Sequence, residues 1–164
     1  GVQTCALPIS TNSGTGLMDV TTVAFNTSAT AAFDADYDAN KLAGALNRHT
    51  LYTVLNDAWL SINTNHDIEH TSTIPMGLEP GVSGDYVISF AGISTFDVTS
   101  TIYLEDLKTG AYHNARSGDY AFYADANDNW NRFVLHFTPA AIITPTNATC
   151  NVNGNINEIG RAHV

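Results

Sequence analysis

Three aspartates in one short stretch offer the first possible chemistry. In DADYDANK, Asp34, Asp36 and Asp38 alternate as the leading ligands of a calcium loop do, because a hard cation takes several carboxylate oxygens from one turn. The sixth position is Ala39 where such a loop needs glycine, and the twelfth is an alanine where it needs glutamate. An EF-hand or dockerin loop is therefore excluded. The stretch predicts either a looser calcium site or a solvated acidic turn capped by Asp38, with Lys41 paired to one of the aspartates.

Two histidines four residues apart are a second candidate. His66 and His70 in NHDIEH have the spacing that places two imidazoles on one helical face for zinc. The stretch shows no helical pattern, glutamate does not directly follow the first histidine, and no third ligand is evident. An exposed loop between strands is the alternative that the surrounding residues favour.

The acidic run LED (104–106) together with Arg132 is the third candidate. Two carboxylates could act as a general acid and base, as they do in glycosidases. In a protein of short strands, however, a lone arginine at the start of a strand favours a bidentate structural bridge to a carboxylate on a neighbouring strand. The sequence contains no pattern typical of a Ser, His and Asp triad, a phosphate loop or a nucleotide fingerprint. We therefore predict no catalytic residues, no cofactor apart from possible calcium, and no enzymatic activity.

The charge balance limits the possible partners. The formal net charge is −10 at pH 7. Nucleic-acid binding needs a basic face that releases counterions from the phosphate backbone, and docking on anionic lipid needs clusters of lysine and arginine. Neither fits this chain, and no apolar run reaches the length of a membrane span. An unknown extracellular protein or glycan remains as the expected partner.

The two ends differ from the polar, threonine-rich sequence between them. Back-translated, GVQTCALPIS and EIGRAHV resemble the complementary strands of one short-read sequencing adapter. A translated linker of this kind is not expected to contribute to the fold. We therefore expect residues 1–10 and 158–164 to pack poorly, and Cys5, Glu158, Arg161 and His163 to have no functional role. The rest is interpreted as a metagenomic fragment of a longer protein.

Short alternating runs rich in valine, isoleucine, threonine and aromatic residues dominate the remaining sequence, which is typical of strands. The predicted strands are 17–25, 50–55, 58–64, 71–78, 84–92, 100–106, 118–125 and 131–138. Turn clusters such as EPGVSG and LKTG separate them. This spacing predicts an all-β antiparallel sandwich, immunoglobulin-like or jelly-roll-like, with one helical turn at 37–44.

The alternation within the last two runs predicts the core. One face carries Tyr120, Phe122 and Ala124 in the first run, and Phe133, Leu135 and Phe137 in the second. Trp59 and Tyr103 are expected to join them. Cleanly alternating aromatic residues of this kind favour packing over ligand stacking.

Five segments, in order, carry a resemblance to a known family. They are AFDADYDANKLAG, LYTVLNDAWLSINT, IPMGLEPGVSGDYVISF, IYLEDLKTGAYHNARSGDYAFYAD and NRFVLHFTP. Together they resemble a β-sandwich module of large exported proteins of gliding gram-negative bacteria, found near the C-terminal sorting domain of the type IX secretion system. The match covers about residues 31–139, and its most specific pieces are YLEDLKTG, DYAFYA and RFVLHF. The resemblance implies a location outside the cell and carries over no catalytic residue.

The resemblance also implies a domain organisation. Residues 11–139 form the β-sandwich domain, and 140–157 form a linker and the start of a following repeat, because TNATCNVNGNI is similar to the opening strand of immunoglobulin-like repeats. Cys150 in this tail is expected either to pair with a cysteine further downstream or to be a free thiol.

The expected function is that of a non-catalytic extracellular or cell-surface module, a spacer or adhesion domain of a multidomain protein. The alternative is a carbohydrate-binding module attached to a secreted hydrolase. A glycan binder needs two or more exposed aromatic side chains that form a platform, whereas a spacer buries nearly all of them. Trp130, in the polar turn DANDNW, is the one aromatic residue that we expect to be exposed.

Overall fold

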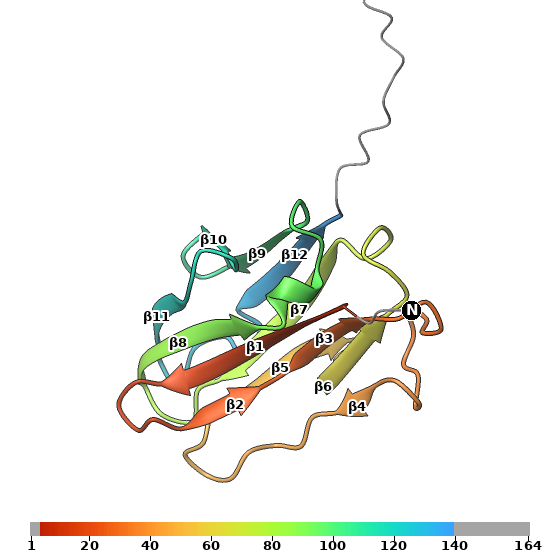
Figure 1. Cartoon of the computed structure of the whole chain (residues 1–164). Helices are drawn as coiled ribbons and strands as arrows, with labels where there is room; N and C mark the ends of the chain where they lie inside the picture. The colour runs from red at the N-terminus through yellow and green to blue at the C-terminus, as the bar shows by residue number, and fades with distance from the viewer. Residues whose placement is uncertain (1–3, 140–164) are drawn as a thin grey trace, which may run out of the picture.

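The computed structural model describes residues 4–139, in which all regular elements except one short turn are strands (Figure 1). The strands are β1 (Thr4–Asn12), β2 (Met18–Val20), β3 (Thr22–Phe25), β4 (Ala39–Asn40), β5 (Thr50–Leu55), β6 (Ala58–Asn65), β7 (Thr73–Glu79), β8 (Gly84–Ala91), β9 (Thr101–Asp106), β10 (Ala111–Asn114), β11 (Tyr120–Ala124) and β12 (Phe133–Thr138). Each predicted run contains an observed strand, and the predicted all-β class is confirmed.

The strands follow one continuous hydrogen-bonded path, in the order β10-β9-β12-β7-β5-β6-β3-β1-β8-β11. All neighbours on this path are antiparallel except β3 and β6, which are parallel. The path wraps around a common interior, so the sheet is a nearly closed barrel with β10 and β11 at its two free edges (Figure 1).

β1 lies well inside this sheet, which corrects the expectation that residues 1–10 pack poorly. Its residues 4–6 pair with β3, and residues 7–12 pair with β8. On the β3 side the pairing continues into β2, so β1, β2 and β3 form one long hairpin. Ala6 is fully buried in the core. The expectation is wrong for residues 4–10, because this stretch supplies backbone donors and acceptors to both neighbours.

Side chains rather than backbone hydrogen bonds close the gap between β10 and β11. The ring of His113 on β10 packs between Phe90 and Tyr120, with ring centroids 6.4 Å and 5.5 Å apart. The hydroxyl of Tyr120 on β11 donates to Asp106 at the end of β9, at 2.8 Å. These contacts hold the two free edges of the sheet near each other.

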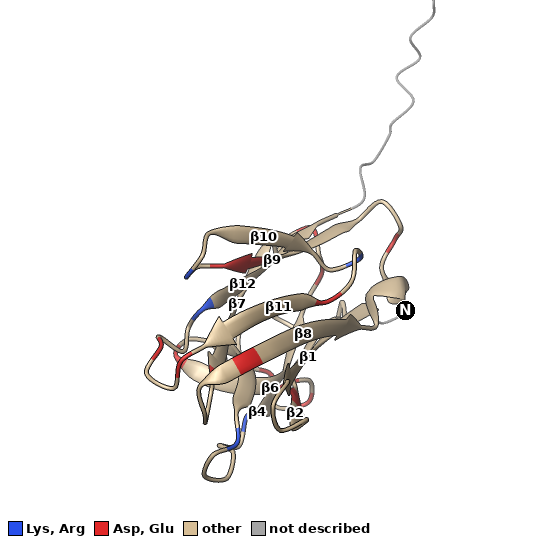
Figure 2. Cartoon of the chain, turned by 90° about the vertical axis from the view of Figure 1, so that its left-hand side faces the viewer, with Lys and Arg blue, Asp and Glu red and all other residues tan. Residues whose placement is uncertain are grey.

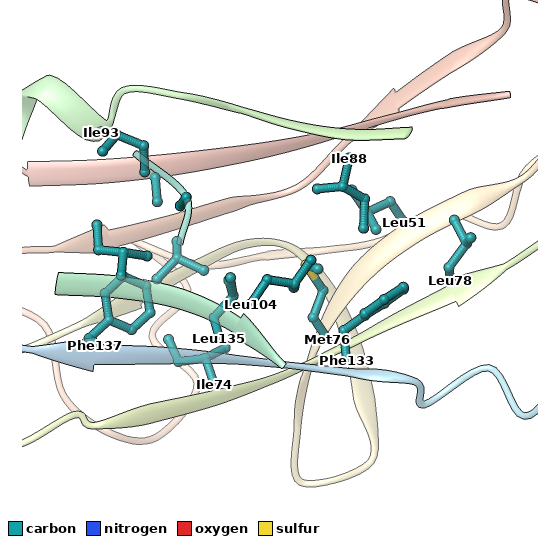
Figure 3. Close-up of a cluster of buried hydrophobic side chains, with 14 of the residues drawn as sticks. Leu51, Ile74, Met76, Leu78, Ile88, Ile93, Leu104, Phe133, Leu135 and Phe137 are labelled. Carbon is teal, nitrogen blue, oxygen red and sulfur yellow. The ribbon is translucent and has the colours of Figure 1, made fainter. Parts of the chain in front are cut away.

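The core fills the interior of the barrel. Figure 3 shows side chains from β5, β7, β8, β9 and β12 pointing into this common space; its labelled residues include Leu51, Ile74, Met76, Ile88, Leu104 and Phe133. Phe122, Ala124, Phe133, Leu135 and Phe137 are buried as predicted, and Tyr120 packs against them, partly buried.

Two core predictions were wrong. Trp59 and Tyr103 are only partly buried and do not belong to the core cluster. Successive side chains of a strand point to opposite faces of the sheet, and the inward positions are occupied by Leu60 on β6 and by Ile102 and Leu104 on β9.

The predicted helical turn at 37–44 is also wrong. A tight turn at residues 34–38, with the amide of Asp38 bonded to the carbonyl of Asp34 at 2.7 Å, leads into β4, which pairs with β6. Within residues 4–139 the single helical element is the 3-10 turn η1 (Ile93–Thr95), and no helix there has the length and apolar character needed to cross a membrane.

Candidate functional site

Arg132 and Asp106 form a buried bidentate ion pair across neighbouring strands. Nε of Arg132 donates to Oδ1 of Asp106 at 2.8 Å, and Nη2 donates to Oδ2 at 2.7 Å. Arg132 is 4% exposed and Asp106 is fully buried. The predicted structural bridge between Arg132 and a carboxylate on a neighbouring strand is confirmed.

A third nitrogen of Arg132 is also used. Nη1 of Arg132 donates to the carbonyl of Tyr123 on β11 at 2.7 Å, and the guanidinium lies over the rings of Phe122 and Phe133. Burial alone would raise the pKa of the Asp106 carboxyl, but hydrogen bonds from Arg132 and Tyr120 outweigh it and hold that pKa below its usual value. A carboxylate held ionised in this way joins β9, β11 and β12.

The acidic stretch at Asp34, Asp36 and Asp38 bonds mainly to backbone amides. Asp38 is buried; its Oδ2 accepts from the amide of Asp34 at 2.8 Å, and its Oδ1 accepts from Thr64 at 2.7 Å. Oδ2 of Asp34 accepts from the amide of Thr30 at 2.6 Å, while Asp36 is exposed. In residues 4–139 no three His, Cys, Asp or Glu side chains gather as a metal site, so calcium at Asp34, Asp36 and Asp38 stays a prediction.

Lys41 pairs with a different aspartate from those expected. Its Nζ donates to Oδ1 of Asp19 on β2 at 2.8 Å and to the carbonyl of Val20 at 2.8 Å. Asp19 also accepts from the amide of Leu51 through Oδ2. The predicted pairing of Lys41 with the acidic stretch was wrong, because the chain after β4 runs beside β2.

His66 and His70 lie in the loop between β6 and β7 that the sequence favoured. Both are exposed, and both pair with Asp67, at 3.4 Å and 2.8 Å. Desolvation is the largest single effect and would raise the pKa of Asp67, but the hydrogen bonds from His70 and the nearby histidine charges together outweigh it and lower that pKa. This arrangement is a local turn contact.

An aromatic pocket on the outside of the barrel was not predicted. The residues that line it are Tyr52, Trp59, Asp128, Asn129, Trp130 and Asn131, and we call it the outer aromatic pocket. It has a volume of about 320 Å³ and opens to solvent. Tyr52 comes from β5, Trp59 from β6, and the other four from the loop that leads into β12.

The aromatic rings of this pocket are stacked in order. Tyr52 and Trp59 lie parallel, with ring centroids 4.0 Å apart, and Trp59 meets Trp130 edge to face at 5.7 Å. Tyr52 points away from the core because Leu51, its neighbour on β5, points inward. Its ring lies against Gly77 of β7, where any larger residue would overlap it.

The hydroxyl of Tyr52 is buried and has no hydrogen-bond partner among the described residues. Burial, with a smaller contribution from the nearby Glu79, raises the pKa of Tyr52 to about 12. Trp130 is 39% exposed, as predicted, but it is not the one exposed aromatic residue, because Phe33, Tyr112 and Tyr123 are exposed as well.

Figure 2 shows that the acidic residues of the described part of the chain lie on several separate loops and strands. The protein is therefore a nearly closed all-β barrel, with a buried ion pair that joins its strands and an aromatic pocket on its outer face. A protein-family model matches residues 8–137, and the chain belongs to that family, which is described as a domain of unknown function, DUF8693. No curated protein and no solved structure gives a significant match.

Proposed function

We propose that this chain is a non-catalytic module of a multidomain secreted or cell-surface protein, acting as a spacer or adhesion domain. Its nearly closed sheet would be a variant of the immunoglobulin-like or jelly-roll-like sandwich. Export through the type IX system, as the sequence resemblance implies, belongs to the same proposal. Asp106 supports the non-catalytic part, because this carboxylate of the candidate acid–base run 104–106 is fully buried and bonded to Arg132 and Tyr120.

Other carboxylates are also engaged in hydrogen bonds or ion pairs within the fold. Asp38 and Asp19 accept hydrogen bonds from backbone amides of distant segments, and Asp128 pairs with Lys108 at 2.6 Å. A general acid or base must instead be free to exchange protons with a substrate. These carboxylates support the fold, as a mechanically stable module requires.

The test of this proposal is recovery of the full-length reading frame. We expect an export signal at its start, further extracellular domains, and a sorting domain near its end. A parent protein with neither an export signal nor a sorting domain would overturn the assignment to the cell exterior.

A carbohydrate-binding module is the second candidate, and one observation favours it. The outer aromatic pocket brings Trp59 and Trp130 together at the surface, beside the polar side chains of Asn129 and Asn131. A pure spacer has no need of paired indoles at its surface.

A further inference from the structure

We propose that the outer aromatic pocket binds a neutral sugar ring, which stacks on Trp130 and Trp59 and bonds through its hydroxyls to the amides of Asn129 and Asn131. This inference rests on the second candidate function above and gives it a site. A pyranose has an apolar face of C–H groups and a polar edge of hydroxyls. The pocket offers both kinds of surface, because indole rings and amide side chains are among the residues that line it.

The pocket is an open depression whose volume fits a small ligand. Its volume of about 320 Å³ lies at the lower end of the usual range, about 300–1,000 Å³. Aromatic rings with a few polar groups at the rim are the typical lining of such sites. The size suits one or two sugar rings.

The hydroxyl of Tyr52 is a second, independent observation. A buried hydroxyl without a partner costs about 1–3 kcal/mol, and proteins seldom keep one without a reason. Tyr52 lines the pocket beneath Trp59. A ligand hydroxyl that enters with a small shift of the indoles would supply the missing partner.

Hydrogen bonds outside the pocket fix the loop that carries Trp130. The carbonyl of Trp130 accepts from the amides of Leu78 and Arg132, each at 2.9 Å, which fixes the loop against β7. Asp128 is held by Lys108, whose hydrogen bond lowers the pKa of that carboxyl. The backbone of Trp130 is therefore fixed, and its indole, which also meets Trp59, is exposed enough to contact a ligand.

The charges around the pocket favour a neutral ligand. Asp128 is ionised at its rim, Glu79 lies near Tyr52, and the whole chain carries a net charge of −10. Anionic sugars such as uronic acids or sulfated glycans would be repelled. Uncharged hexoses and pentoses would not be repelled.

The sequence supplies a direct probe, because Trp59 and Trp130 are the two tryptophans of the chain. We would titrate the whole chain with cellohexaose, xylohexaose, mannohexaose and laminarihexaose and follow tryptophan fluorescence. At least one of them should change the emission with saturation, and titration calorimetry should give the same dissociation constant. No saturable change with any of the four would overturn the proposal.

Single-residue variants test whether the sugar binds in the outer aromatic pocket. Trp130→Ala should weaken binding at least about thirtyfold, as the loss of a central aromatic contact does, and Asn131→Ala should weaken it several-fold. Tyr123→Ala, which removes an aromatic side chain that is 54% exposed on β11, is the matched control and should leave binding unchanged. Thermal unfolding checks that each variant is folded, and wild-type affinity in both pocket variants would overturn the proposal.

Two further measurements distinguish failure of the sugar site from failure of the proposed non-catalytic function. Chromatography of the oligosaccharides after incubation tests catalysis: cleavage overturns the non-catalytic function, whereas intact but unbound sugars overturn the sugar site alone. Titration with decaproline tests a peptide ligand, and saturable binding of decaproline without binding of any sugar would also overturn the sugar site.

Discussion

Arg132 and Asp106 meet through two parallel hydrogen bonds of 2.8 Å and 2.7 Å in a site that excludes water almost completely. The pair lies where β9, β11 and β12 come together, near the gap between the two free edges of the sheet. Its position indicates that it helps to hold the barrel closed where backbone pairing ends.

Removal of one partner of this ion pair should therefore lower the stability of the fold substantially. Arg132→Met leaves the Asp106 carboxylate buried without its counter-ion, and we expect the free energy of unfolding to fall by about 3–5 kcal/mol. Urea unfolding followed by circular dichroism measures this loss.

The exposed pair Lys108–Asp128 serves as the control. The side chain of Lys108 is 45% exposed, so Lys108→Met should cost at most about 1 kcal/mol. Similar losses in the two variants would contradict the structural role of the buried pair.

Much of the fold could be predicted from local sequence patterns. The predicted bounds of β5, β6, β8 and β12 agree with the structure to within two residues, because these runs are rich in β-branched and aromatic residues and are bounded by turn residues. The four-residue β10 was missed, since it is a short edge strand without clear alternation. Closure of the sheet into a barrel could not be predicted, because it depends on pairing between strands far apart in the chain.

β1 was missed for a different reason. The back-translation of this stretch resembles adapter DNA, and a translated linker is not expected to form part of a fold. Its burial alternates as in any strand, but the smaller or more polar residues face inward: Ala6, Pro8 and Ser10 are buried, while Leu7 and Ile9 are only partly so. Pattern alone would have placed the larger residues inward.

Only some of the candidate sites could be predicted from the sequence. The bridge of Arg132 followed from its charge and its place at the start of the predicted strand 131–138. The outer aromatic pocket joins three separate segments, so no local pattern reveals it. One feature of the sequence does point to it. Tyr52 and Trp59 are the strand neighbours of the inward-pointing Leu51 and Leu60, so both rings point to the outer face of the sheet.

The structure predicts a large effect of removing β1. Without residues 1–10, β3 and β8 each lose a strand neighbour, so we expect the melting temperature to fall by at least about 10 °C or cooperative unfolding to vanish. Differential scanning calorimetry measures it. The sequence predicts no change beyond a degree or two for deletion of residues 158–164, which is the control. Equal melting temperatures for both deletions would show that β1 is dispensable.

Stability should also depend on pH through His49. This residue is buried, and its Nε2 donates to the carbonyl of Ser10 at 3.2 Å. Desolvation is the largest effect and lowers the pKa of His49, despite opposing effects of Ser10 and Asp19. The unfolded chain then binds a proton more readily than the folded one, so stability is lost as pH falls from about 6.5 towards the lowered pKa.

Urea unfolding between pH 8 and pH 5 tests this dependence. His49→Gln keeps an N–H donor but cannot take up the proton, so its stability should vary less over this range than that of the wild type. Identical pH profiles for the two proteins would rule out His49 as the source.

Calcium provides the last test, because the acidic stretch was the first chemistry that the sequence suggested. If Asp34, Asp36 and Asp38 bound the ion in the native state alone, a hundredfold excess over the dissociation constant would add about 2.7 kcal/mol of stability. We expect instead no change in melting temperature between millimolar calcium and a chelator, because Asp38 already accepts from the amides of Asp34 and Thr64. Asp36→Asn should behave as the wild type does, since this side chain is exposed. A calcium-dependent rise that Asp36→Asn abolishes would establish the site.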